Sequence, residues 1–400
     1  MKLTSYAKRG LSLLDLDRNL WLLFATGLVG VVSIQLILPL FPLFLDSHGA
    51  SEMEISFVIS LSSLATTALM IPVGFLMERV GKKRMLLIGL LIWAVTPVFM
   101  GSARNWRIVA PLYMVYNLAD VFVGPARMAM IAEYSNPESQ ATVFGIMSMD
   151  WPVGGIVSPP LSGLLAERSG WHLTFQVAAI VMALTLVPVL MLKDKDERGP
   201  QEERISVLNI FRREYLTTIF LFFIFTCALS TGQSILSIIL PIFLKNQMDL
   251  SLTNIGLFFT GSSVLSLLSQ VPGGWLADRY GRKRVIMAFL LPIPFIFSAW
   301  SMVSDWVAML VLYSLFAGCL SMMGSASLAL LSDSFPSELK GAAFSVRMTG
   351  FRMGSIVGPL LGGYLYSSLS PKSPFIAAAL LFFIGFPIVY LIKEKPKQLF

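Results

Sequence analysis

Long apolar runs separated by short polar gaps dominate the sequence. A helix that spans a bilayer needs about 20 mostly apolar residues, and windows of this kind succeed one another along the 400-residue chain. They cover 19–45, 52–77, 85–102, 106–132, 141–166, 172–192, 215–244, 252–277, 285–302, 305–331, 341–366 and 374–392. No run alternates apolar and polar residues as barrel strands do. The pattern predicts an all-α polytopic membrane protein with twelve transmembrane helices.

The composition supports a membrane protein and removes other classes. Apolar residues make up 56% of the chain and charged residues 13%, the latter about half the usual share of a soluble protein. The mean hydropathy is +0.75. So few charges cannot coat soluble domains, which excludes a soluble enzyme, a nucleic-acid binder and a disordered scaffold as first interpretations.

Positive charge is distributed unequally between the two sides of the predicted bundle. With the N-terminus inside, the inner segments hold 22 Lys and Arg residues and the outer loops hold five. Cytoplasmic loops carry such an excess, so we expect an integral protein of the plasma (inner) membrane with both termini cytoplasmic. The same distribution accounts for the net charge of +7 without an anionic macromolecule, and no nucleic-acid partner is expected.

The two halves of the chain repeat each other at an offset of 200 residues. Residues 72–84 align with 272–284 with seven identities in thirteen positions, and an even number of helices with inside termini places both halves the same way up. We therefore expect two six-helix parallel repeats around a central cavity. The predicted domains are an N-terminal six-helix bundle (1–192), a cytoplasmic linker (193–214) and a C-terminal six-helix bundle (215–400).

One polar turn in each half carries a recognisable motif. Residues 74–84 read GFLMERVGKKR, and residues 274–284 read GWLADRYGRKR. Both resemble the G-x-L-a-D-R-x-G-R-K/R signature of the major facilitator superfamily, although Glu78 replaces the usual Asp, and the resemblance covers the whole chain. It implies a secondary transporter whose two bundles rock about a central site.

These turns form a candidate conformational latch. Glycine permits a tight turn, and a carboxylate can form charge-assisted bonds to an arginine or a helix end across the bundle interface. The latch candidates are Gly74, Glu78, Arg79, Gly81, Asp278, Arg279, Gly281 and, from the eleventh run, Arg347. A charged turn that only follows the distribution of positive charge is the alternative.

Away from the ends of the predicted spans there are five charged residues: Asp120, Arg127, Asp150, Arg347 and Arg352. Each costs about 2.5–3.5 kcal/mol near a helix centre on insertion scales, so each is a candidate functional residue. Helix geometry predicts an Arg127–Asp150 pair and sets Asp120 on the Arg127 face about 10 Å deeper. Asp120, Asp150 and Arg127 are therefore proton-coupling candidates, with permanent salt bridges as the alternative. Arg352 is expected to contact an anionic group of the substrate or to stabilise the opposite bundle.

Polar and aromatic residues within the spans supply further candidates. The family resemblance implies that the first, fourth, seventh and tenth helices line the cavity. The substrate-cavity candidates are Arg352, Gln35, Asn117, Tyr113, Trp151, Gln233 and Gln270. Hydrogen bonding between helices is the alternative role for the amides.

The eleventh run contains a glycine pattern. Residues 354–363 read GSIVGPLLGG, which is similar to a pattern of the fifth helices of exporters in the family, and residues 154–163 carry a degraded copy, GGIVSPPLSG. Small residues four positions apart let helices pack closely, so close packing explains the pattern as well as export does.

Together these features predict a secondary active transporter that works by alternating access. Proton-coupled export (antiport) of small amphipathic or drug-like compounds is the leading function. Symport of a small organic anion with protons is the alternative, because the predicted spans bury three arginines but only two aspartates. A non-transporting membrane sensor or assembly factor is an alternative of another class.

Other chemistry finds no support in the motifs. No phosphate-binding GxxxxGK[ST] motif is present, and the two cysteines and two histidines form no metal-ligand pattern. We expect neither an enzyme, nor a cofactor, nor a metal. The expected partners are a small-molecule substrate, protons and the lipid bilayer, and the protein is expected to be a monomer.

Overall fold

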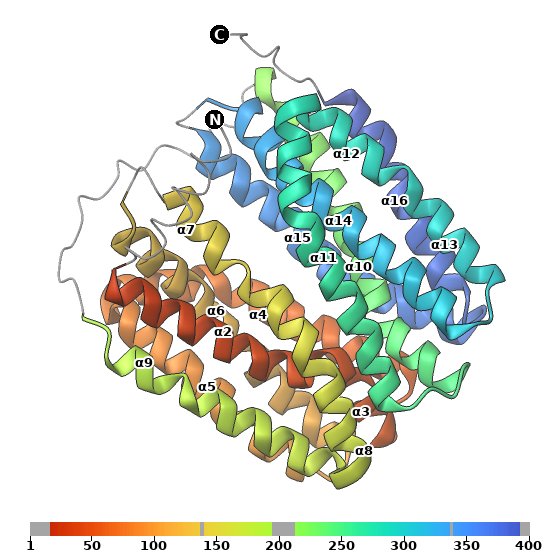
Figure 1. The fold of residues 1–400 in the computed structure, drawn as a ribbon. Coiled ribbons are helices and arrows are strands. Elements are labelled where there is room, and N and C mark those ends of the chain that lie inside the picture. Colours follow the sequence, from red (N-terminus) through yellow and green to blue (C-terminus); the bar gives the residue numbers. More distant parts are fainter. Residues whose placement is uncertain (1–16, 137–139, 194–212, 337–338, 393–400) are drawn as a thin grey trace.

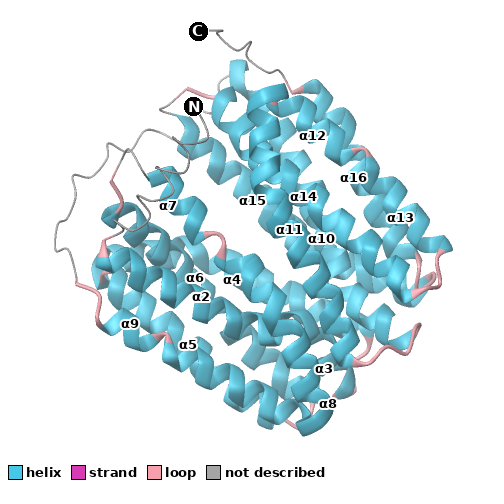
Figure 2. Ribbon diagram, viewed as in Figure 1, coloured by secondary structure: helices cyan, strands magenta, loops and turns pink. Residues whose placement is uncertain are grey.

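The computed structural model describes residues 17–136, 140–193, 213–336 and 339–392, which contain helices and turns but no strand (Figure 2). The predicted all-α fold is confirmed. The helices are α2 (Arg18–Ile37), η2 (Leu38–Leu40), α3 (Phe41–Ser47), α4 (Glu52–Val80), α5 (Lys82–Ser102), α6 (Trp106–Tyr134), α7 (Gln140–Met147), α8 (Asp150–Leu184), α9 (Leu186–Leu190), α10 (Arg213–Asn246), α11 (Leu252–Tyr280), α12 (Arg282–Leu290), α13 (Pro292–Met302), α14 (Trp306–Ser334), α15 (Lys340–Ser368) and α16 (Ser373–Leu391).

The described helices account for the twelve predicted spans. Ten helical stretches are long and apolar enough to cross a membrane. One of them, Val143–Leu190, contains two crossings, because the chain reverses inside α8 at Gly170, where φ is 81°. The remaining crossing is α15, whose apolar character is reduced by Arg347 and Arg352. The fifth predicted span differs in one respect, since the chain turns between α7 and α8 just before Asp150.

The helices form two groups that diverge toward one side of the molecule (Figure 1). The first group comprises α2–α9, and the second comprises α10–α16. We call the side on which α2 begins and α16 ends the Arg18 face, and the side on which the chain reverses within α8 the Gly170 face. The groups contact each other mainly through α8 against α11 and through α4 against α15.

Small residues bring the two groups together toward the Gly170 face. A Cβ on Gly163 of α8 would overlap the Leu252 carbonyl of α11, and a Cβ on Gly363 of α15 would overlap the Ser56 hydroxyl of α4. The Ser60 hydroxyl of α4 also donates to the Ile356 carbonyl of α15 at 2.7 Å. Close packing of small residues is thus one use of the glycine pattern, as expected for membrane helices.

The turn motif repeats in space as well as in sequence. Gly81 and Gly281 both have positive φ, 93° and 97°, which favours glycine. Lys83 Nζ donates to the Leu192 carbonyl at 2.6 Å, and Lys283 Nζ donates to the Ile392 carbonyl at 2.8 Å. In both copies the lysine therefore caps the end of the last helix of its own group.

The residue before each of these lysines also repeats its contact. Lys82 Nζ lies 2.7 Å from Glu133 Oε2 at the end of α6. Arg282 forms the equivalent ion pair with Asp333 at the end of α14. The acids are 200 residues apart, like their partners, so these atomic contacts support the internal repeat.

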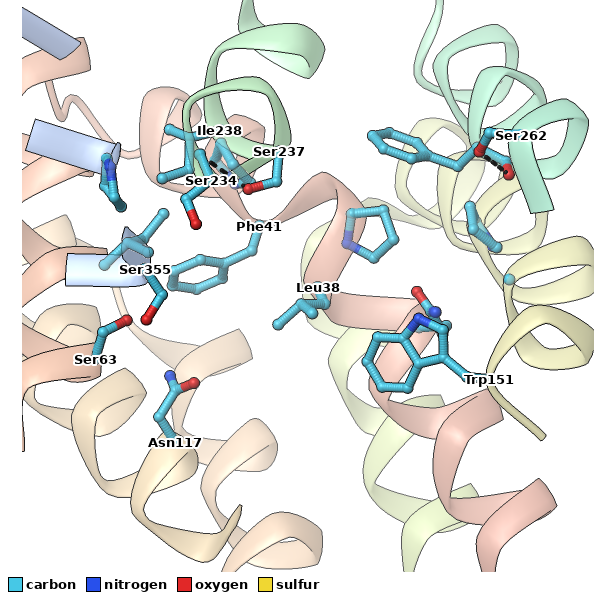
Figure 3. A pocket seen from close by; sticks show the side chains of 18 of the residues that line it. Leu38, Phe41, Ser63, Asn117, Trp151, Ser234, Ser237, Ile238, Ser262 and Ser355 are labelled. Atoms are coloured by element: carbon cyan, nitrogen blue, oxygen red, sulfur yellow. Dashed lines mark hydrogen bonds between the residues drawn. The ribbon is translucent and has the colours of Figure 1, made fainter. Parts of the chain in front are cut away.

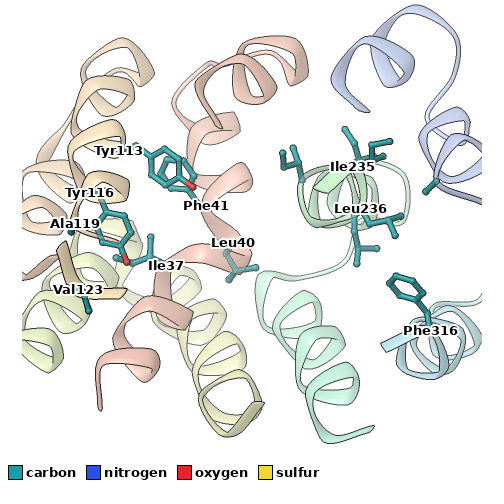
Figure 4. Packing of buried hydrophobic residues seen from close by; sticks show 14 of the residues in the cluster. Ile37, Leu40, Phe41, Tyr113, Tyr116, Ala119, Val123, Ile235, Leu236 and Phe316 are labelled. Atoms are coloured by element: carbon teal, nitrogen blue, oxygen red, sulfur yellow. The ribbon is translucent and has the colours of Figure 1, made fainter. Parts of the chain in front are cut away.

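Apolar side chains pack inside each group and also cover the outside. Figure 4 shows Phe41, Tyr113 and Tyr116 packed in the first group, and Ile235, Leu236 and Phe316 packed in the second. Large apolar side chains are also exposed on the outer surface, for example Phe295 at 67%. An outer surface this apolar suits lipid rather than water.

Candidate functional site

Two adjoining cavities lie between the helix groups. The serine-lined cavity has a volume of about 430 Å³ and is bordered by α2, η2, α3, α4, α6, α8, α10, α11 and α15. The ion-pair cavity has a volume of about 510 Å³ and is bordered by α2, η2, α4, α5, α6, α8 and α15. Both cavities share Leu38, Ser63, Asn117 and Trp151, so they adjoin.

The ion-pair cavity lies on the Arg18 side of the serine-lined cavity. Along α2 its lining runs from Thr26 to Ile34, whereas that of the serine-lined cavity begins at Gln35. No residue of α14 lines either of these two cavities. The expectation that the tenth helix contributes is therefore wrong for them; α8, α11 and α15 supply walls instead.

Arg127 and Asp150 form the predicted ion pair in the ion-pair cavity. Arg127 Nη2 of α6 lies 2.6 Å from Asp150 Oδ2, and the Asp150 side chain is only 5% exposed. Asp150 stands in the first turn of α8, where the positive end of the helix dipole stabilises a carboxylate. The break between α7 and α8 therefore gives Asp150 a favourable position as well as a partner.

Gly27 of α2 makes room for this pair. A Cβ at Gly27 would overlap Arg127 Nη2 and lie 2.6 Å from Asp150 Oδ2. Sequence reasoning missed Gly27, because glycine is frequent in transmembrane helices and nothing in the chain marks which glycine faces a charge. Any side chain at this position must displace the guanidinium.

Asp120 and Arg352 form a second pair that joins the two groups. Arg352 Nη2 of α15 lies 3.2 Å from Asp120 Oδ2 of α6. The Asp120 side chain is 46% exposed and borders the ion-pair cavity. This ion pair connects the first group to the second. Sequence reasoning singled out both residues but did not pair them.

Arg347 does not join these pairs. It lines neither cavity, and its buried Nε has no hydrogen-bond partner among the residues that the structure describes. Its predicted contact, the side chain of Glu78, lies outside the described part of the chain. A role for Arg347 in a latch stays a prediction.

The other latch candidates lie at the Arg18 face. Gly74 belongs to α4, Arg79 is exposed near the end of that helix, and Asp278 is exposed at the end of α11. The guanidinium of Arg279 lies 5.2 Å from the centre of the Trp275 ring, on its own helix. The basic residues of these turns whose partners are described bond within their own group. A latch across the groups stays a prediction.

The substrate-cavity candidates fall into two sets. Gln35, Asn117, Tyr113 and Trp151 line the serine-lined cavity, and Arg352 lines the ion-pair cavity. Gln233 and Gln270 line neither. Successive helical residues are rotated by about 100°, so Ser234 can line the cavity while its neighbour on α10 does not.

Serines are the lining residues that sequence reasoning missed. They are Ser63, Ser234, Ser237, Ser262, Ser263 and Ser355. Serine in a membrane helix often bonds to the carbonyl of the preceding turn, as the Ser262 hydroxyl does to the Phe259 carbonyl at 2.8 Å. A single serine is therefore a poor marker of a cavity, and only the fold brings these six together.

Comparison with protein families gives a match along nearly the whole chain. The sequence profile of the Major Facilitator Superfamily matches residues 23–231 and 222–399. Multidrug resistance protein 1 of Bacillus subtilis is 23% identical over 384 residues, which cover 94% of this chain and 95% of that protein. Quinolone resistance protein NorA of Staphylococcus aureus is 22% identical over 401 residues, which cover 96% and 99%.

A solved structure shows the same fold. It is a bacterial homologue of the human lysosomal transporter Spinster in an inward-facing, occupied conformation. The TM-score is 0.77 with 13% sequence identity, and the match covers 93% of this chain and 96% of that one. At this identity the likeness concerns the fold alone.

Proposed function

Because this chain belongs to the major facilitator superfamily of membrane transporters, we propose that it exports small amphipathic, drug-like compounds in exchange for protons. One observation carries the proposal. Asp120, a carboxylate that borders the ion-pair cavity, bonds to Arg352 of the opposite helix group. The serine-lined cavity, which is large enough for a ligand, adjoins it. The multidrug and quinolone resistance proteins among the relatives favour drug-like compounds as substrates.

The excess of positive charge assigns the Arg18 face to the cytoplasm of a plasma membrane. The clusters at 79–84 and 279–284 lie on that face, and cytoplasmic segments carry such clusters. Both termini are then cytoplasmic, and the cavities receive substrate from the cytoplasmic side. The helix groups, which correspond to the predicted domains 1–192 and 215–400, are the bodies that rock, and a monomer suffices for this cycle.

Asp120 is the proton carrier in this proposal. A proton and the Arg352 guanidinium compete for the same carboxylate, and protonation removes the charge that holds α15 to α6. Asp150 is less suited, because its side chain is 5% exposed and bonds to Arg127 at 2.6 Å. We assign Arg127 and Asp150 the role of a fixed positioning pair next to the carrier.

Symport of an organic anion loses its main support. It rested on a surplus of buried arginine, but Arg127 and Arg352 each bond to an aspartate. Arg347 borders neither cavity. An anionic substrate would have to compete with an existing carboxylate for either guanidinium of the ion-pair cavity. In proton antiport the substrate does not have to compete for these guanidinium groups.

Proton release by the purified protein tests the proposal. Ethidium, acridone and salicylate are added to the protein in weakly buffered detergent with a pH-sensitive dye. We expect release with a transported compound and its loss in Asp120→Asn. Asp249→Asn is the matched control, because Asp249 is 98% exposed on the surface. Release that persists in Asp120→Asn contradicts the assignment of the carrier, and proton uptake with salicylate favours symport.

A double charge swap separates the two roles of the fixed pair. In Arg127→Asp with Asp150→Arg, a purely positioning pair is restored with opposite polarity. We expect the swap to recover proton-driven transport relative to either single variant. If transport stays lost although the swapped protein folds, one of these residues carries the proton.

A further inference from the structure

The serine-lined cavity carries no charged side chain. None of its lining residues is Asp, Glu, Lys, Arg or His. The charges of the adjoining ion-pair cavity are paired, Arg127 with Asp150 and Arg352 with Asp120. A charged group that leaves water without a counter-ion has a large desolvation cost. This cavity therefore favours an uncharged ligand.

Its polar groups are neutral hydrogen-bonding groups. Gln35 is only 7% exposed, borders the cavity and has no hydrogen-bond partner among the residues that the structure describes. An amide offers two N–H donors and one carbonyl acceptor, and buried polar groups in native proteins are nearly always bonded. A ligand with neutral donors and acceptors matches the unused amide.

Gln35 lies near one hydroxyl of the second group, that of Ser263, at Gly155. A Cβ on Gly155 would overlap Ser263 Oγ of α11 and lie 3.6 Å from Gln35 Nε2 of α2. The hydroxyls of Ser263 and Ser234 likewise have no hydrogen-bond partner within the described ranges. Both helix groups thus present unused polar atoms to one cavity, and Gln35 and Ser263 approach each other at Gly155.

Aromatic side chains of the first group form the apolar part of the cavity wall. The Phe41 ring stacks on Tyr113 with centroids 3.8 Å apart and an interplanar angle of 15°, so its position is fixed. Trp151 borders both cavities and is half-exposed. Figure 3 shows Phe41 beside the serine side chains and Trp151 on the other side of Leu38. Flat apolar surfaces therefore lie next to the hydroxyl groups.

We infer that the serine-lined cavity binds an uncharged amphipathic molecule with a planar apolar body and a hydrogen-bonding edge. The body lies against Phe41 and Trp151, and the edge bonds to Gln35 and Ser263. The cavity volume of about 430 Å³ lies in the range of small-molecule sites. This inference rests on the proposed function, since it names the substrate class of that transporter.

A pair of probes with the same ring system tests the ligand class. Acridone is planar and neutral and carries one donor and one acceptor, whereas 10-methylacridinium has a similar shape and a permanent positive charge. We expect the purified protein to bind acridone at least tenfold more tightly, as measured by fluorescence anisotropy. Equal or tighter binding of the cation overturns the inference.

Substitutions of Gln35 test the site. Gln35→Leu should weaken acridone binding about tenfold, because a hydrogen bond to a desolvated ligand group is lost. Gln233→Leu is the matched control, since that amide borders neither cavity, and it should leave the affinity unchanged. Equal losses in both variants, or none in Gln35→Leu, contradict the assignment.

A gain of function keeps the test decisive if Gln35→Leu does not fold. Gln35→Glu places a carboxylate in the cavity and should raise the affinity for 10-methylacridinium relative to acridone. No change in this preference contradicts the site. Failure of the proposed function is distinguishable, because acridone would then bind with the predicted preference but release no proton from either the wild type or Asp120→Asn.

Discussion

The two helix groups share a scaffold but differ in their buried chemistry. Both contain a positive-φ glycine turn, a lysine that caps the last helix, and an ion pair to the end of α6 or α14. At the offset of 200 residues, however, Arg127 corresponds to Ser327 and Asp150 to Gly350. A turn and a helix cap are needed in every copy, whereas buried charge is costly in a bilayer. The buried pair of Arg127 and Asp150 therefore has no counterpart at the equivalent described positions of the second group.

The small-residue faces of α8 and α15 belong to the shared scaffold. Gly154 packs on Val31 of α2, and Gly354 packs on Ser230 of α10, so each helix uses this face within its own group. Gly155 and Gly363 instead face the other group, against Ser263 and Ser56. The repeat thus preserves packing contacts both within and between the groups.

Removing the charge that is specific to the first group should cause the largest loss in the free energy of unfolding. Asp150→Ala removes the counter-ion of the Arg127 guanidinium, whose side chain is 17% exposed in the wild type. Breaking a buried pair on one side costs about 3–5 kcal/mol. Steric trapping in bicelles measures the free energy of unfolding. Gly350→Ala in the second group also meets a close contact, the Phe223 carbonyl, but it changes no charge. A similar loss in both variants would show packing, not charge, to be responsible.

Displacing the pair without removing it should have an intermediate effect. Gly27→Ala places a methyl group where Arg127 Nη2 lies, and we expect a loss of about 1–3 kcal/mol from overpacking together with altered proton coupling. Gly30→Ala is the matched control on α2, because its Cβ would meet only Thr185 Cγ2 at 3.8 Å. Equal behaviour of the two variants in unfolding and proton-release measurements would contradict the special role of Gly27.

The shared turns should respond alike in the two groups. Gly81→Ala and Gly281→Ala place a Cβ on backbone with φ of 93° and 97°, a region that costs about 1–3 kcal/mol for other residues. We expect losses that agree within about 0.5 kcal/mol, measured by steric trapping of each group. A large difference would show that the two turns contribute unequally to stability, contrary to the repeated scaffold.

The helix caps should give the smallest effects. Lys83→Met and Lys283→Met each remove charge-assisted hydrogen bonds to terminal carbonyls, and each bond contributes about 1–3 kcal/mol at most, less where water replaces the donor. We expect about 1 kcal/mol or less for each, with unchanged proton release. Altered release in one variant alone would mean that its turn takes part in the conformational change.

The sequence determined the features that depend on local patterns. Run length specified the spans, and charge with glycine in register specified the repeat and its turns. The Arg127–Asp150 pair was predictable as well, because depth along two adjacent helices follows from counting residues at 1.5 Å each.

Tertiary structure decided which side of each helix faces inward. Sequence reasoning treated Gln35 and Gln233 alike, yet of these two only Gln35 borders the serine-lined or the ion-pair cavity. Sequence reasoning also did not pair Asp120 with Arg352 or single out Gly27. A soluble helix shows its inward face as an apolar stripe, but a helix between lipid and protein is apolar all round. The rotation of each helix therefore leaves little trace in the sequence, and only packing against neighbours fixes it.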